Sequence, residues 1–134
     1  MSAPLFVPKS ATKVAIALVR DGLPGGHHDV LVTDAVPDER PSRLVRLSRI
    51  AGGGFTAHGA TDTARFLVEV WGDDVDATED LANVVRAVLR ASRSRWAGGA
   101  FVRKWNEDTG PYPFPDESGQ ERWQMTGELL IKVG

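Results

Sequence analysis

The sequence predicts a single α+β domain in which a mostly antiparallel sheet carries two helices on one face. Two segments place apolar residues at helical spacing, several others alternate or run apolar as strands do, and successive strands lack helices between them. A chain of 134 residues is long enough for one core. We expect an N-terminal arm at residues 1–8, followed by one domain at residues 9–134 with the order α-β-β-β-α-β-β.

Two segments are predicted to be helices. The first follows Ser10 as N-cap and ends at Gly22. The second follows Asp76 as N-cap, carries a continuous apolar stripe and ends near Ser94. Acidic residues gather at its start and basic residues toward its end, among them Asp73, Asp74, Arg86, Arg90 and Arg93. This distribution complements the helix macrodipole.

Strands are predicted at Asp29–Ala35, Arg43–Ile50, Thr63–Trp71, Ala100–Asn106 and Glu121–Val133. We expect the second strand to stop at the triplet Gly52–Gly54, read as a flexible connection. In the third strand, Leu67 and Trp71 share a face with charged residues, which predicts that this face is partly covered. Residues 107–120 contain three prolines and are predicted to form a long hairpin loop.

Composition and charge exclude several classes of protein. The chain is 42% hydrophobic and 25% charged, as globular proteins are, and its net charge of −2 gives no general attraction to nucleic acid or anionic membranes. The absence of cysteine excludes disulfides, a thiol nucleophile and cysteine-based metal sites. No apolar run is long enough to span a bilayer, and the N-terminus lacks a signal-peptide pattern, so we expect a protein made in the cytoplasm without membrane contact.

No motif in the sequence predicts an active site, a metal site or a cofactor. His27 and His28 would point to opposite faces of a strand, and only His58 could join them. The triplet Gly52–Gly54 is not followed by the lysine and hydroxyl residue of a phosphate loop. The carboxylates of Asp73–Asp76 are accounted for by a helix start, and no nucleophile elbow is present. We therefore expect no enzyme.

Two features instead favour contact between protein chains. Arginines recur every third residue through the second strand, and acidic and basic residues are segregated along the chain. A solvated strand and a dipole-matched helix end would also produce this pattern. Tyr112 and Phe114 lie in the proline-rich segment Pro111–Pro115, where aromatic side chains have little core to join. The interface residues predicted from these features are Arg43, Arg46, Arg49, Arg86, Arg90, Arg93, Asp73, Asp74, Tyr112 and Phe114.

Three passages together resemble the tail-terminator (tail-completion) proteins of long-tailed bacteriophages. They are Ala64–Asp74 (ARFLVEVWGDD), Asp80–Leu89 (DLANVVRAVL) and Gly127–Val133 (GELLIKV). The likeness spans about residues 9–134. It implies an α+β protomer that forms a homohexameric ring on the last ring of the tail tube. That ring would stop tube polymerisation and present a docking surface to the head–tail connector protein, and genomic DNA would pass through its lumen. The implied location is the head-proximal end of the tail.

Other functions remain open at this point. A second connector role, such as a head-closure or neck protein, would bind on the portal side. A small-ligand-binding or regulatory α+β domain would show a pocket lined by Trp105 or Trp123. A nucleic-acid binder using the arginines would show steeply salt-dependent DNA affinity.

Overall fold

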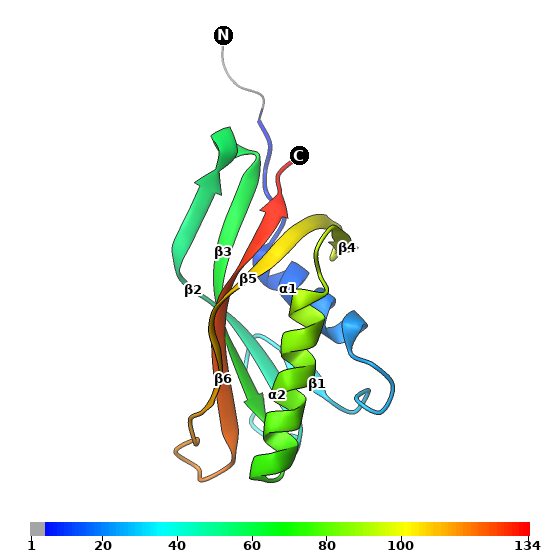
Figure 1. The fold of residues 1–134 in the computed structure, drawn as a ribbon, viewed down its shortest axis with the longest axis vertical. Helices are drawn as coiled ribbons and strands as arrows, with labels where there is room; N and C mark the ends of the chain where they lie inside the picture. Colours follow the sequence, from blue (N-terminus) through cyan, green and yellow to red (C-terminus); the bar gives the residue numbers. More distant parts are fainter. Residues whose placement is uncertain (1–4) are drawn as a thin grey trace.

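The computed structural model describes residues 5–134, apart from the side chain of Ala57. It consists of a six-stranded, strongly curved sheet and two helices that pack against its concave face (Figure 1). The strand order across the sheet is β1-β2-β3-β6-β5-β4. The elements are α1 (Ala11–Gly22), β1 (Leu31–Thr33), β2 (Leu44–Thr56), the short 3₁₀ helix η1 (Ala57–Gly59), β3 (Thr61–Trp71), α2 (Val75–Arg90), β4 (Arg95–Ala97), β5 (Ala100–Pro113) and β6 (Arg122–Lys132).

The prediction of a mostly antiparallel sheet is wrong, because the sheet is mixed. Strand β1 pairs in parallel with β2, with Leu31 opposite Leu44 and Thr33 opposite Arg46. The remaining neighbours pair antiparallel. The connection at residues 34–43 carries the chain back past β1 before β2 begins, which a tight hairpin turn could not do. The alternation pattern of a single strand does not reveal this connection.

Strand β4 is an additional element that the predicted order lacks. Helix α2 ends at Arg90, four residues before the predicted end. The residues that follow turn back and form β4. Gly98 and Gly99, at φ values of +55° and +77°, form the two-residue turn between β4 and β5. A two-residue hairpin turn of type I′ requires positive φ angles at both residues, and glycine adopts them without steric cost.

Several predicted boundaries move for local reasons. Strand β2 continues through Gly52–Gly54, with a register shift between Ile50 and Gly53. A Cβ atom on Gly53 would lie 2.1 Å from the carbonyl oxygen of Thr63, so the close pairing of β2 with β3 depends on glycine at this position. Strand β5 extends to Pro113, and the loop to β6 occupies residues 114–121 instead of the predicted 107–120.

Both helices begin at a side-chain cap. The predicted cap of α1 is confirmed, since the Ser10 hydroxyl accepts a hydrogen bond from the Lys13 amide at 3.3 Å. Helix α2 begins two residues earlier than predicted. Its N-cap is Asp74, whose carboxylate accepts from the Ala77 amide at 2.8 Å.

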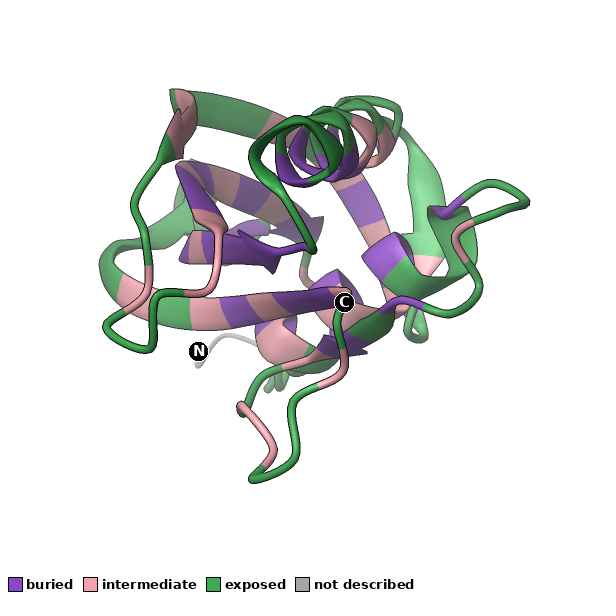
Figure 2. Ribbon diagram, turned by 90° about the horizontal axis from the view of Figure 1, so that it is seen from below, coloured by how far each residue is buried: buried purple, intermediate pink, exposed green. Residues whose placement is uncertain are grey.

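The core lies between the helices and the concave face of the sheet. Figure 2 shows the buried residues on the sides of helix and sheet that face one another. Phe66, Val68 and Val70 of β3 are fully buried there, together with Leu81 and Val85 of α2. Among the described residues, no helix covers the opposite, convex face of the sheet. Residues 5–8 of the predicted arm form no regular secondary structure, and residues 1–4 lie outside the described residues.

Candidate interaction surfaces

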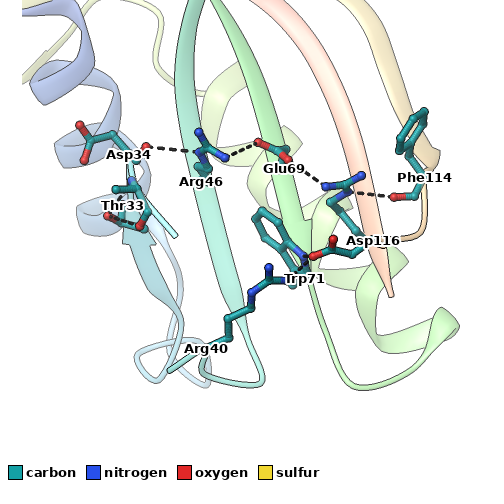
Figure 3. Close-up of polar contacts among 10 residues, drawn as sticks. Thr33, Asp34, Arg40, Arg46, Glu69, Trp71, Phe114 and Asp116 are labelled. Atoms are coloured by element: carbon teal, nitrogen blue, oxygen red, sulfur yellow. Dashed lines mark hydrogen bonds and ion pairs between the residues drawn. The ribbon is translucent and has the colours of Figure 1, made fainter. Parts of the chain in front are cut away.

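A row of ion pairs crosses the convex face of the sheet and is centred on Glu69. The Glu69 side chain is only 7% exposed and lies between Arg46 of β2, at 3.7 Å, and Arg122 of β6, at 3.3 Å (Figure 3). The register of the sheet produces this arrangement, because Glu69 is paired with Arg46 on one side and Gln124 on the other. A buried carboxylate is tolerated when opposite charges compensate for its lost hydration.

The two arginines of this row also donate hydrogen bonds to backbone carbonyls on either side of it. The guanidinium of Arg46 donates to the carbonyl of Asp34 at 3.3 Å, beyond the end of β1. On the other side, Arg122 donates to the carbonyl of Phe114 at 2.9 Å, at the start of the 114–121 loop. Figure 3 shows the row running from Asp34 to Phe114. These contacts join five segments of the chain: the end of β1, strands β2, β3 and β6, and the 114–121 loop.

Trp71 lies on this convex face and is covered there by side chains from other segments of the chain. Its side chain is buried, and its indole N–H donates to the Asp116 carboxylate at 3.0 Å. Arg40 also pairs with Asp116, and the guanidinium groups of Arg40 and Arg122 lie over the Trp71 ring. The Trp71 hydrogen bond, with Arg40 and Arg122 nearby, lowers the pKa of Asp116 to about 2. The prediction that this face of the third strand is partly covered is therefore confirmed.

Tyr112 and Phe114, predicted as interface residues, lie at the edge of this row. The Tyr112 hydroxyl donates to the Gln124 side chain at 3.1 Å. The Phe114 ring meets the Tyr112 ring edge-on at 6.3 Å and lies 5.2 Å from the Arg122 guanidinium. Phe114 nevertheless stays 51% exposed. It is the large apolar side chain that the 114–121 loop presents to solvent.

The three arginines of the second strand that were predicted as interface residues are separated by the structure. Arg43 contacts the Asp29 carboxylate at 2.7 Å and the His27 ring at 2.6 Å, next to β1. Arg49 lies 3.6 Å from the buried Asp62 of β3. Arg46 contacts Glu69, as described above. Each of the three therefore has a carboxylate partner within its own chain.

A groove of about 420 Å³ lies between α2 and β5. Arg86 forms two hydrogen bonds of 2.6 Å with the Glu107 carboxylate across it. This contact raises the pKa of Arg86. Arg90 and Trp105 line the groove with them. The Trp105 ring packs so closely on Gly127 that a Cβ atom there would lie 2.3 Å from it.

The remaining predicted interface residues lie at the two ends of α2. Asp73 and Asp74 precede the helix; Asp74 is used as its cap, whereas Asp73 is exposed. Arg93 is exposed in the turn after the helix. Within residues 5–134, neither Asp73 nor Arg93 lies within ion-pair distance of an opposite charge.

Sequence reasoning missed the partners that organise these surfaces: Glu69, Arg122, Asp116, Gln124 and Glu107. One signal was available, since Glu69 was placed on the same strand face as Leu67 and Trp71, a face expected to be covered. A carboxylate on a covered face requires a counter-charge. Which arginines supply it depends on the sheet register, which the sequence does not show.

The described residues contain neither a metal-binding cluster nor a membrane-spanning helix. In residues 5–134, no three His, Cys, Asp or Glu residues are arranged to hold a metal ion. No helix described in the structure is long and apolar enough to cross a membrane.

Comparison with known proteins shows similarity at the level of structure. No protein-family model matches the chain, and no curated protein matches it by sequence. Among solved structures, a chain of the virion of a native gene transfer agent (GTA) particle is similar, with a TM-score of 0.60 and 18% sequence identity. The match covers 91% of this chain and 87% of that one. The two chains share a fold. The similar region includes almost all of each chain.

Proposed function

We propose that this chain is a structural protein of a phage-like virion. The observation that carries the proposal is the fold shared with a chain of a gene transfer agent virion over nearly its full length. Because the identity is 18%, that likeness speaks for the fold, and the virion role is our inference from it. The function is expected to consist of binding other virion proteins.

Within the virion, we propose the role of a tail terminator. In this role, copies of the chain form a ring, with six as the expected number, that caps the tail tube, stops its growth and receives the head–tail connector protein. The resemblance of Ala64–Asp74, Asp80–Leu89 and Gly127–Val133 to tail-terminator proteins supports it. So does the presence of two unlike surfaces, since a ring needs one surface for contact between its copies and another for its virion partners.

The two surfaces differ in the state of their charges. On the convex face of the sheet, the Glu69 carboxylate is paired with both Arg46 and Arg122. On the exposed side of α2, most charges have no partner in residues 5–134. A rigid, internally paired surface suits docking by shape, whereas an unpaired one suits docking by charge.

Electron microscopy of the full-length protein mixed with tail tubes of the same virion tests the role. The expected result is a ring at one end of each tube and an arrest of further tube growth. A protein that stays monomeric at high concentration and leaves tube ends bare and growing would refute it. Binding to portal-side particles instead of tubes would identify a head-closure or neck protein.

A second candidate, a ligand-binding domain, is favoured by one observation. The groove between α2 and β5 contains Trp105, which such a domain was predicted to use. Arg90, which has no ion-pair partner in residues 5–134, would select an anionic ligand. A rise in Tm with small dicarboxylates, abolished by Arg90→Ala, would support this candidate, and an unchanged Tm would reject it.

A further inference from the structure

We propose that the exposed face of α2 joins neighbouring copies of this chain head to tail. The acidic first half of one helix contacts the basic second half of the next, at the groove beside Arg90. This inference deepens the proposed ring and rests on it. It identifies the partner as a second copy of the same chain and the contact as electrostatic.

The exposed face of α2 is divided into two halves of opposite charge. The buried side of the helix carries Thr78, Leu81, Ala82, Val85 and Leu89. The exposed charged positions of the first half are Asp76, Glu79 and Asp80, and those of the second half are Arg86 and Arg90. Helical geometry places these charged residues along a single stripe.

Only part of this division serves the stability of the helix. Asp76 and Asp80 are four residues apart, and so are Arg86 and Arg90. Like charges at this spacing are neighbours on the helix surface and repel each other, whereas alternating charges would attract. Like charges within each half of the helix therefore repel each other. Opposite charges from outside the helix would offset this repulsion.

The chain itself does not supply most of that opposite charge. In residues 5–134, Asp76, Glu79, Asp80 and Arg90 lack an ion-pair partner, and only Arg86 has one, in Glu107. Beyond the helix, the basic half continues through the exposed Arg93 and Arg95. The arginines of β2, by contrast, are all paired within the chain.

The two halves cannot meet within one molecule. Asp76 and Arg90 are separated by fourteen residues of straight helix, or roughly 21 Å at the usual rise. Contact between them therefore requires two chains. When each copy offers both halves, a head-to-tail contact uses different surfaces on the two partners. Repeated around an axis, such contacts can close into a ring.

Charge reversal tests the pairing of the two halves. A Glu79→Lys, Asp80→Lys variant reverses two charges of the acidic half, and an Arg90→Glu, Arg93→Glu variant reverses two charges of the basic region. We expect each alone to self-associate roughly tenfold more weakly than the wild type by analytical ultracentrifugation. A mixture of the two should recover assembly, because the copies can alternate. These substitutions leave the cap residue Asp74 intact, and circular dichroism confirms that each variant folds.

Cross-linking tests the head-to-tail geometry. The chain has no cysteine, so an Asp76→Cys, Arg90→Cys variant carries the only two thiols. A disulfide requires Cα atoms about 4–7 Å apart, which excludes a link within one helix. Oxidation should give a ladder of species that ends at the closed ring. The single variants should give no product larger than a dimer.

The outcomes separate this inference from the proposed function. A double-cysteine variant that stops at dimers would show a two-fold contact between antiparallel helices and would overturn the head-to-tail arrangement. Reversed variants that assemble as well as the wild type would overturn the charge pairing, while the ring itself would stand. If the wild type forms no ring alone or on tail tubes, the proposed function fails with it.

Discussion

The carboxylate of Asp116 is expected to make folding stability depend on pH in the acid range. In the folded protein its pKa is lowered from 3.8 to about 2, with the Trp71 hydrogen bond as the largest cause. A depressed carboxylate pKa adds stability above the unfolded value and loses it as the pH falls through the folded value. The shift of nearly two pKa units corresponds to about 2 kcal/mol at pH 7. About half of that should remain at pH 3.

Urea unfolding of the wild type and of Asp116→Asn, followed by circular dichroism between pH 7 and pH 3, isolates this contribution. Other carboxylates titrate in both proteins and cancel in the difference. The difference in unfolding free energy should shrink steadily below pH 4. Asparagine retains an oxygen that can accept the Trp71 N–H, so the remaining difference reflects charge. A difference that stays constant down to pH 3 would refute the assignment.

Three further substitutions probe the fold through urea or thermal unfolding. Glu69→Gln removes the charge from a buried site between two arginines and should cost about 2–4 kcal/mol. Asp74→Ala removes the N-cap of α2 and should cost about 1 kcal/mol, whereas Asp73→Ala should be neutral. Gly127→Ala places a Cβ atom 2.3 Å from the Trp105 ring and should cost about 1–3 kcal/mol.

Matched controls exist for two of these changes. Glu117→Gln removes a carboxylate from an exposed position that has no ion pair in the described residues, and it should leave the unfolding free energy unchanged. Gly25→Ala adds a Cβ atom that meets nothing within 4 Å. If either control destabilised the protein as much as its test variant, the named contact would not be the cause.

The sequence predicted the elements better than their arrangement. Alternation in Thr63–Trp71 correctly separated the buried Phe66 and Val68 from Arg65 on the other face. The parallel pairing of β1 with β2 could not be predicted, because it depends on the path of residues 34–43 across the molecule. Strand β4 left one signal, the Gly98-Gly99 pair between two aromatic residues, which is typical of a tight hairpin.

The spacing of the strand arginines contained more information than the prediction used. Side chains alternate between the two faces of a strand, so residues three apart point to opposite faces. Arg46 must therefore point away from Arg43 and Arg49, and the three cannot form one patch. Their carboxylate partners, Asp29, Glu69 and Asp62, lie far from them in the sequence or across a strand pairing, and only the folded register identifies them.

The helix macrodipole accounts for only part of the charge on α2. Its influence falls off within the first and last turn, so it explains Asp76 near the start and Arg90 at the end. Glu79 and Asp80 lie in the second turn of the helix, and Arg86 lies just before its last turn. Each of these residues nevertheless has the same sign of charge as the nearer end of the helix: Glu79 and Asp80 are negative, and Arg86 is positive. Because the dipole does not reach these positions, and because spacing of like charges by four residues weakens a helix, the segregation needs another cause. Contact with a second chain of the same charge pattern would supply that cause.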